Sequence, residues 1–511
     1  MMNKDSKAGR REWFGLFAIL LPTLVVTMDI SILFLAIPHL SVALEASSIQ
    51  ILWITDIYGF MIAGFLLVMG SLGDRFGSRR LLMIGAGAFS AVSVVAAFST
   101  SPEMLIIARA ILGIAGATLM PATLSLISVM FVHSKQRSLA IGIWVTTMSV
   151  GISIGPLVGG LLLENFWWGS VFLVSVPFMG LLLVTAPLFI PKHQGIQSGS
   201  IDFLSVILSL TSMLLIVYGF KSIPVYGFEW QLIVSIIMGL FIGTLFIRRQ
   251  RNLKDPLVDV KLFKGLAFCA AFVLLLFGMI AINGMEYLFP QFLQMVSGLS
   301  PFQAGLWTIP GAMAVIVGSM VAPILSRRIS PAYVVGSGMV IAAIGFSLMS
   351  LVESSSSFFI LVVGLVIAQL GIAPILVLGT DLVVGSAPSN KSGSTSAIAE
   401  ISGELGIALG IAIMGSISSA VYRQRIMASN TESPGDYQDS LSGALALADQ
   451  VPEEMLVMAR EAFTHGFNVA AIVSSVLCLF LAILSVVMLR HVKPTSDVEG
   501  HEEFEVKKRS I

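Results

Sequence analysis

Charged side chains are scarce in this chain. Lys and Arg number 29, Asp and Glu also number 29, and the formal net charge of the 511 residues is zero. Such a balance offers no basic face to a nucleic acid. The hydrophobic share of 56% also exceeds what a soluble domain usually carries. We therefore expect a membrane protein without a nucleic-acid partner.

Cysteine and phosphate-binding motifs are also sparse. The two cysteines, Cys269 and Cys478, fall in apolar runs and indicate neither a disulfide framework nor a zinc site. No Gly-x-x-x-x-Gly-Lys-Ser/Thr loop, catalytic nucleophile and base, or metal-ligand cluster stands out. We expect no enzyme, no ATP site, and no cofactor or metal. Uphill transport would need an ion gradient, which supplies about 2.3 kcal/mol per charge per 100 mV.

Long hydrophobic runs are what the chain has in abundance. They predict an all-α integral membrane protein with fourteen transmembrane helices. The predicted helices lie near residues 14–36, 50–71, 80–99, 103–128, 138–162, 169–190, 201–219, 230–247, 266–290, 302–325, 332–352, 357–385, 395–421 and 466–490. The first run follows a basic start, as in a signal peptide, but it contains Asp29 and lacks a small-residue cleavage site. We interpret it as a retained helix.

The distribution of Lys and Arg predicts how the helices are oriented. With a cytoplasmic N-terminus, only four basic residues fall outside. They are Lys221, Arg423, Arg425 and Arg460. The cytoplasmic side then holds nearly all the others, which predicts a multi-pass protein of the cytoplasmic membrane with both termini inside.

Residue pairs at a spacing of about 252 to 258 indicate an internal repeat. The pairs include Pro38 with Pro290, Trp53 with Trp307, and Lys135 with Lys391. The repeat predicts two six-helix bundles, 1–190 and 266–490, with two inserted helices in 191–265 and a cytoplasmic tail at 491–511. Residues 422–465 are expected to form a long outer loop, either a solvated linker or a cover over an exit.

Charged residues inside predicted spans are the first functional candidates, because they are costly in a bilayer and normally face a cavity or a partner. They are Asp29, Asp56, Arg109, Glu286, Glu400 and Glu404. At 1.5 Å per residue, Asp29, Asp56 and Arg109 each lie about 9 to 10 Å from the outer ends of their helices, so one layer could hold all three. Asp29 is the first choice for a proton-carrying acid. A fixed Asp29–Arg109 pair that only joins two helices is the alternative.

The remaining acids leave their roles open. Asp56 is expected to contact a substrate or to be wetted near its helix end. Glu400 and Glu404 share a helix face, and either could handle substrate or protons. Glu286 is predicted near the outer end of its helix, where it would attract cations or contact lipid headgroups. The span 302–325 has no acid, which would weaken the handling of dications with widely separated charges.

Large, soft side chains accompany these acids. The candidate pocket residues are Trp53, Tyr58, Met61, Trp144, Met148 and Trp307. Aromatic faces attract cations and thioethers adapt to irregular shapes, so the set suits flat lipophilic cations. Ordinary helix packing is the alternative for each.

One predicted helix carries a row of small residues. Gly151, Gly155 and Gly159 recur at every fourth position, next to Gly160, which predicts close contact with a second helix. Pro156 lacks a backbone donor and should bend the helix at this face.

Several segments resemble a known family. Residues 70–80, Gly-Ser-Leu-Gly-Asp-Arg-Phe-Gly-Ser-Arg-Arg, resemble the loop signature between the second and third helices of the major facilitator superfamily. The run around Arg109 resembles its fourth-helix motif, and the glycine row resembles its antiporter motif. Residues 27–29, 36–38 and 53–58 are similar to the fourteen-helix drug:proton antiporters, especially the quaternary ammonium compound efflux pumps.

The resemblance implies a proton-coupled antiporter that exports lipophilic cations such as quaternary ammonium antiseptics and intercalating dyes. It also implies a cytoplasmic latch formed by Asp74, Arg75, Gly77, Arg79 and Arg80, for which a basic loop with a glycine turn is the alternative. We expect a monomer. Two other classes stay open: an exporter of a metabolite or lipid, which would not expel such dyes, and a non-transporting sensor, against which the intramembrane acids count.

Overall fold

The computed structural model describes residues 8–46, 48–192, 202–226, 229–253, 256–354, 359–385, 391–428, 438, 440–447, 452–492 and 494. Within these ranges the chain is helical and contains no β-strand. Fourteen of the described helices are long and apolar enough to cross a membrane. The predicted all-α fold with fourteen spans is confirmed, and the chain is a multi-pass membrane protein. Apart from residues 491, 492 and 494, the predicted tail lies outside the described residues.

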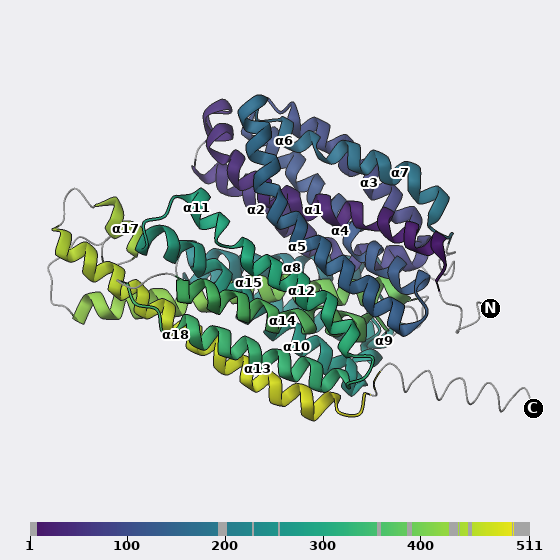
Figure 1. Cartoon of the computed structure of the whole chain (residues 1–511). Helices are drawn as coiled ribbons and strands as arrows, with labels where there is room; N and C mark the ends of the chain where they lie inside the picture. The colour runs from purple at the N-terminus through teal and green to yellow at the C-terminus, as the bar shows by residue number, and fades with distance from the viewer. Residues whose placement is uncertain are drawn as a thin grey trace, which may run out of the picture. The chain divides into compact units, whose positions relative to one another are not determined.

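Long helices make up the spans (Figure 1). The first six spans are α1 (Arg10–Ala43), α2 (Ser48–Phe76), α3 (Ser78–Ala97), α4 (Pro102–Met130), α5 (Ser134–Asn165), and α6 (Ser170–Leu173) with α7 (Ser175–Phe189). The next two are α8 (Phe203–Tyr226) and α9 (Trp230–Asn252), followed by a short 3-10 helix, η1 (Val260–Lys264). Both lie where the sequence predicts two inserted helices.

Six further spans follow. They are α10 (Leu266–Gln291) with the π-helical turn η2 (Phe292–Val296), α11 (Pro301–Leu306) with α12 (Ile309–Leu325), α13 (Pro331–Met349), α14 (Phe359–Gly385), α15 (Ser392–Ala428) and α18 (Glu453–Leu489). The short helix α17 (Leu441–Ala446) lies between the last two in the chain.

Three spans extend furthest beyond the predicted ranges. The span of α10 continues through η2 to Val296, α15 continues to Ala428, and α18 begins at Glu453. Both ends of the expected outer loop 422–465 are therefore helical. A hydropathy window identifies only the apolar residues expected to lie in the bilayer, whereas the polar residues that follow can continue the same helix outside it.

Contacts group the chain into two compact units, which we describe separately. Unit 1 comprises Met1–Tyr218, Ile233–Phe272 and Val377–Ile401, and unit 2 comprises Gly219–Leu232, Val273–Leu376 and Ser402–Ile511. The boundaries fall inside α8, α9, α10, α14 and α15. Unit 1 therefore contains α1 to α7, most of α8 and α9, η1, the start of α10, and the adjoining ends of α14 and α15. The division into two sequence-defined bundles stays a prediction.

In unit 1, the glycine row of α5 packs against α1. A Cβ added at Gly151 would overlap the hydroxyl group of Thr27, and one added at Gly155 would overlap that of Ser31. Gly160, by contrast, faces open space. The absence of side chains at the first two positions lets the two backbones approach closely.

In unit 2, α13 and α18 run side by side (Figure 1). The hydroxyl groups of Ser347 and Ser475 lie 2.9 Å apart across this contact, and Ser485 Oγ donates to the carbonyl oxygen of Ala332 at 3.2 Å. Small residues and hydroxyl groups are typical of helix contacts in a membrane, where apolar surface alone gives no net attraction between helices.

Candidate functional site

A buried ion pair joins α1 to α4 in unit 1. Arg109 Nη1 lies 2.5 Å from Asp29 Oδ2, and the two side chains are only 1% and 7% exposed. Both residues lie within membrane-spanning helices. An isolated charge at such a place is costly, and the ion pair offsets part of that cost for both residues. The structure thus brings together two of the six predicted intramembrane charges.

The same arginine is also held by α2. Arg109 Nε donates to the carbonyl oxygen of Ile54 at 3.3 Å, and its guanidinium carbon lies 4.4 Å from the centre of the Tyr58 ring. Ile54 and Tyr58 are one turn apart, so α2 presents both from one face. The ring of Phe172 approaches from another side at 6.0 Å. Tyr58, a predicted pocket residue, is buried here against the guanidinium group.

The glycine face of α5 lies next to this ion pair. Thr27 and Ser31 flank Asp29 in the sequence of α1, and their hydroxyl groups donate to carbonyl groups of α1 itself. The same hydroxyl groups are what a Cβ at Gly151 or Gly155 would meet. The position of α1, which carries Asp29, therefore depends on the absence of side chains at these glycines of α5.

The other predicted acids occupy different surroundings. Asp56 is half-buried on α2, two residues beyond Ile54. Glu400 and Glu404 are half-buried and one turn apart on α15, with Glu400 in unit 1 and Glu404 in unit 2. Asp56 lies on the helix that also contacts Arg109.

Glu286 belongs to unit 2, where its carboxylate accepts a hydrogen bond from Gln369 Nε2 of α14. The residue itself is exposed, whereas Gln369 is buried. The sequence predicts Glu286 near the outer end of its helix, but the span continues for ten more residues, through η2, to Val296. At 1.5 Å per residue Glu286 lies about 15 Å from that end, farther from the end of its helix than the sequence predicts.

The predicted aromatic and methionine residues are unequally accessible. Trp53 is exposed, and Met61, Met148 and Trp307 are half-buried. Trp144 is buried, and its Nε1 donates to Thr123 Oγ1 at 3.1 Å. Trp144 thus connects α5 to α4, while the exposed and half-buried residues are the ones a ligand could reach.

Asp74, at the end of α2, caps the first turn of α15. Its Oδ1 accepts from the amide of Gly393 at 2.6 Å and its Oδ2 from the amide of Ser394 at 2.8 Å. Amides in the first turn of a helix have no intrahelical acceptor, and the positive end of the helix dipole favours an anion there. Gly70 lies against Gly393 so closely that a Cβ at either residue would overlap the backbone of the other.

The rest of the predicted latch lies around this contact. Gly77 precedes α3 with φ of +92°, a conformation that side-chain-bearing residues rarely adopt. Arg79 donates to the carbonyl oxygens of Ile190 and Pro187, at 2.8 and 3.2 Å. Arg75 is half-buried and Arg80 is exposed. Arg79 therefore ties α3 to the end of α7 through backbone carbonyl groups.

Sequence analysis missed Asp381. Arg137 Nε lies 2.6 Å from Asp381 Oδ1, and Ser138 Oγ donates to Oδ2 of the same carboxylate, which joins α5 to α14 within unit 1. Asp381 is the only acidic residue in the apolar α14. That isolation is the signal that could have identified it.

Three serines form a buried chain near Asp74. The hydroxyl group of Ser125 lies 2.7 Å from Ser78 Oγ and 2.7 Å from Ser392 Oγ, so that α3, α4 and α15 are joined. Serine is common in membrane helices, and no spacing in the sequence distinguishes these three. Asp74, Arg137, Asp381 and Ser392 lie at one end of unit 1, which we call the Asp74 end.

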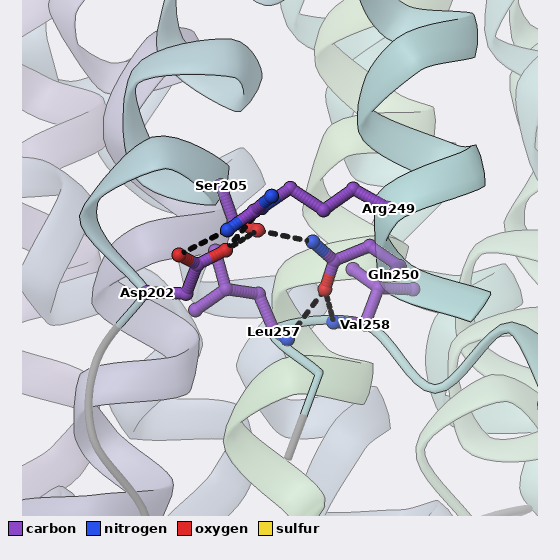
Figure 2. A network of polar contacts seen from close by, with 6 residues as sticks. All are labelled: Asp202, Ser205, Arg249, Gln250, Leu257 and Val258. Carbon is purple, nitrogen blue, oxygen red and sulfur yellow. Dashed lines mark hydrogen bonds and ion pairs between the residues drawn. The ribbon is translucent and has the colours of Figure 1, made fainter. Parts of the chain in front are cut away.

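A polar network joins the two inserted helices (Figure 2). Arg249 contacts Asp202 through two hydrogen bonds, Nε to Oδ2 at 2.6 Å and Nη2 to Oδ1 at 2.8 Å. These bonds hold the pKa of the Asp202 carboxyl below its usual range. Gln250 Nε2 donates to Ser205 Oγ, and Gln250 Oε1 accepts from the amide of Leu257 at 2.7 Å.

The segment that follows α9 contacts the residue before α15. Asp259 Oδ2 accepts from Lys391 Nζ at 2.9 Å, and this contact lowers the pKa of the Asp259 carboxyl. Lys391 directly precedes α15, whose first amides bind Asp74. The inserted helices are thus connected through this segment to the helix end that Asp74 caps. Among the described residues, no group of three His, Cys, Asp or Glu side chains could hold a metal ion.

Fourteen membrane spans and a buried intramembrane ion pair are features of a polytopic membrane transporter. Residues 19–411 match the Major Facilitator Superfamily, and the chain belongs to this family. It is a membrane transporter and not an enzyme. The family resemblance found in the sequence is confirmed.

Two relatives and one solved structure illustrate the similarity. The multidrug efflux pump LfrA of Mycolicibacterium smegmatis is 37% identical over 479 residues, covering 92% of this chain and 95% of that protein. The methyl viologen resistance protein SmvA of Salmonella typhimurium is 33% identical over 481 residues, covering 93% and 97%. The human organic anion transporter MFSD10 superposes with a TM-score of 0.63 at 14% identity, covering 93% and 99%. That structural likeness shows the fold alone.

Proposed function

We propose that this protein is a proton-coupled antiporter that exports lipophilic cations, including quaternary ammonium compounds and intercalating dyes, from the cytoplasm. The observation that carries the proposal is Asp29, a carboxylate buried in a membrane span and paired with Arg109. The names of the relatives, a multidrug efflux pump and a methyl viologen resistance protein, support the substrate class.

The ion pair supplies a means of coupling. A proton on Asp29 removes its charge, and Arg109 is then held only by the Ile54 carbonyl group and by the rings of Tyr58 and Phe172. Loss of one partner from a buried pair changes the free energy of the site by about 3 to 5 kcal/mol. A proton that changes the energy of one conformation by this amount shifts the equilibrium between conformations.

The Asp74 end of unit 1 faces the cytoplasm in this proposal, and both termini lie in the cytoplasm, as the positive-inside rule favours. The contacts of Asp74 with α15, of Arg137 with Asp381 and of Asp259 with Lys391 then lie at the cytoplasmic ends of the helices. In an alternating-access cycle these contacts break and re-form, and they constitute the latch.

Substrate cations are recognised by acids and soft surfaces. Asp56, Glu400 and Glu404 supply negative charge, while exposed Trp53 and half-buried Met61, with Met148 and Trp307, supply polarisable surface. The protein functions as a monomer in this proposal.

Purified protein in proteoliposomes tests the proposal. An imposed pH gradient should drive ethidium transport, and collapsing the gradient should stop it. Asp29→Asn should abolish this gradient-driven transport, because an amide cannot carry the proton. Thermal unfolding should show that the variant is still folded. Glu164→Gln, which removes an exposed acid at the end of α5, is the matched control and should transport normally. Full coupled transport by Asp29→Asn would rule out Asp29 as the proton carrier.

A further inference from the structure

Glu286 and Gln369 meet where α10 packs against α14. Gln369 Nε2 donates to Glu286 Oε1, a bond strengthened by the charge of the carboxylate. Two turns earlier on α10, Gly278 faces Ile375 of α14, at 3.5 Å from where its Cβ would lie. The two helices are thus in contact over this stretch. The amide fixes one carboxylate oxygen and leaves Oε2 available, on a residue that is exposed.

A second acceptor comes from the backbone of the same residue. Pro290 stands four residues after Glu286 inside α10 and has no N–H. The carbonyl group of Glu286 therefore lacks its usual helical donor. Directly beyond Pro290 and Gln291 the helix passes into the π-helical turn η2, a feature that occurs often at functional sites.

Glu286 and Gln369 both lie well inside the candidate membrane spans of their helices. Ten residues separate Glu286 from the end of its span at Val296, and ten separate Gln369 from the start of α14 at Phe359. Both distances are about 15 Å along the helix axis. An exposed carboxylate within a membrane span indicates a ligand pathway.

The third helix at this site packs closely beside the amide. Gly311 of α12 lies 3.0 Å from Leu365 and 3.5 Å from Gln369 Cγ, measured from where its Cβ would be. Glycine at this position lets α12 approach Gln369 closely. Since α12 has no acidic residue, Glu286 is the carboxylate at this junction of α10, α12 and α14.

We propose that Glu286 forms a cation subsite that prefers cations with N–H donors, such as amidinium and primary ammonium groups, to quaternary ammonium groups. A quaternary cation gains only charge attraction, whereas an amidinium group also donates to Oε2 and to the freed carbonyl oxygen. Gln369 is a positioning residue that holds the carboxylate in the orientation these donors require. This inference rests on the proposed function, since it subdivides the same class of cations.

Two probes of equal size separate donor recognition from charge attraction. An aryl amidinium and the corresponding aryl trimethylammonium are titrated against the purified protein in detergent. Gln369→Met keeps the volume and removes the donor, so it should weaken amidinium binding about tenfold and trimethylammonium binding less than twofold. Glu286→Gln should weaken both probes, the amidinium more. Glu164→Gln should change neither.

Equal losses for both probes in Gln369→Met would show a structural role and overturn the proposal, as would unchanged amidinium binding. Gln369→Asn keeps the amide but shortens its reach, so it should also weaken amidinium binding more than trimethylammonium binding. It replaces the Met variant in this test if that variant is unstable. Binding is measured without a pH gradient, so it tests the subsite independently of antiport. Selective binding without gradient-driven export would contradict only the proposed function, and export without selectivity would contradict only the subsite.

Discussion

Arg109 and Arg137 both pair with aspartates, but their surroundings differ. The Arg109 pair is almost wholly buried, whereas Arg137 and Asp381 are 20% and 12% exposed. Water screens a partly exposed pair and stabilises either partner if the other is removed. The first pair should therefore govern folding within unit 1, and the second should mainly affect which conformation is populated.

Asp381→Asn tests this difference. The amide keeps the shape of the side chain and can still accept from Ser138, so thermal stability should change by about 1 kcal/mol or less. Transport should slow, because the contact of α5 with α14 loses its charge. Arg109→Met, the comparison, should cost about 3 to 5 kcal/mol by leaving Asp29 buried and unpaired. Similar unfolding temperatures for the two variants would contradict this ranking.

Single residues show where sequence reasoning succeeds and where it stops. Asp29 and Arg109 were identifiable because a charge in an apolar run demands a partner. Gln369 was not, since a lone amide costs much less in a helix and its importance depends on meeting Glu286 across a helix contact. The Ser125 hydroxyl chain gave no signal for the same reason: its role follows from packing, which the spacing within one helix does not specify.

At the scale of helices, the glycine row on α5 combines two kinds of position. Gly155 lies against α1, where an added Cβ would overlap Ser31 and come within 3.1 Å of the Met28 carbonyl oxygen. Gly160 has no heavy atom within 4 Å of its added Cβ. The sequence motif treats these glycines alike, but only the first restricts the distance between helices.

The pair provides a matched test of helix packing. Gly155→Leu should push α1 away from α5, destabilise the protein by roughly 1 to 3 kcal/mol and reduce transport, because Asp29 moves with α1. Gly160→Leu adds the same side chain at an open position and should retain both stability and transport. Thermal unfolding and dye transport measure the two effects. Equal behaviour of the variants would show that the α1–α5 contact is not tight.

Helix ends were less predictable than helix cores. The fourteen apolar segments were identifiable because crossing a bilayer requires about 20 apolar residues. The π-helical turn after α10 was missed, since Pro290 indicates a helix end when only hydropathy and proline are considered. As a consequence, Glu286 was predicted closer to the end of its helix than it lies, which shows how an error in one element transfers to the site it carries.

At the scale of the whole chain, the inserted helices and the segment that follows them contact α2 and Lys391 at separate places. α8 packs on α2, where Leu214 lies 3.0 Å from an added Cβ at Gly64 and the rings of Phe60 and Tyr218 are 6.3 Å apart. The segment after α9 is attached to α15 through Lys391. The repeat in the sequence identified the pair as an insertion but gave no indication of these attachments.

The network in Figure 2 should protect the segment after α9 from proteolysis. The pKa of Asp202 is lowered by Arg249, so the contribution of this contact is complete above the ordinary pKa of aspartate and is lost as pH falls through the lowered pKa. Arg249→Met should therefore increase cleavage by proteinase K between residues 252 and 265 at neutral pH, where the unmodified protein is protected.

The neighbouring Arg248 is exposed and gives the control for this experiment. Arg248→Met should leave the cleavage rate at neutral pH unchanged. Acidification should raise cleavage in the unmodified protein only below the usual aspartate range, and it should have little further effect in Arg249→Met. Equal cleavage of all three proteins at neutral pH would show that the network does not restrain the segment.

Helix α18 is 37 residues long, or about 55 Å, whereas a hydrocarbon core is about 30 Å thick. Roughly a third or more of this helix therefore projects beyond the core as a rigid arm, and α17 packs against it. A tilt of about 10° around its far end would move the tip by about 10 Å. A small angular change of this helix within the bilayer would therefore become a large displacement outside it.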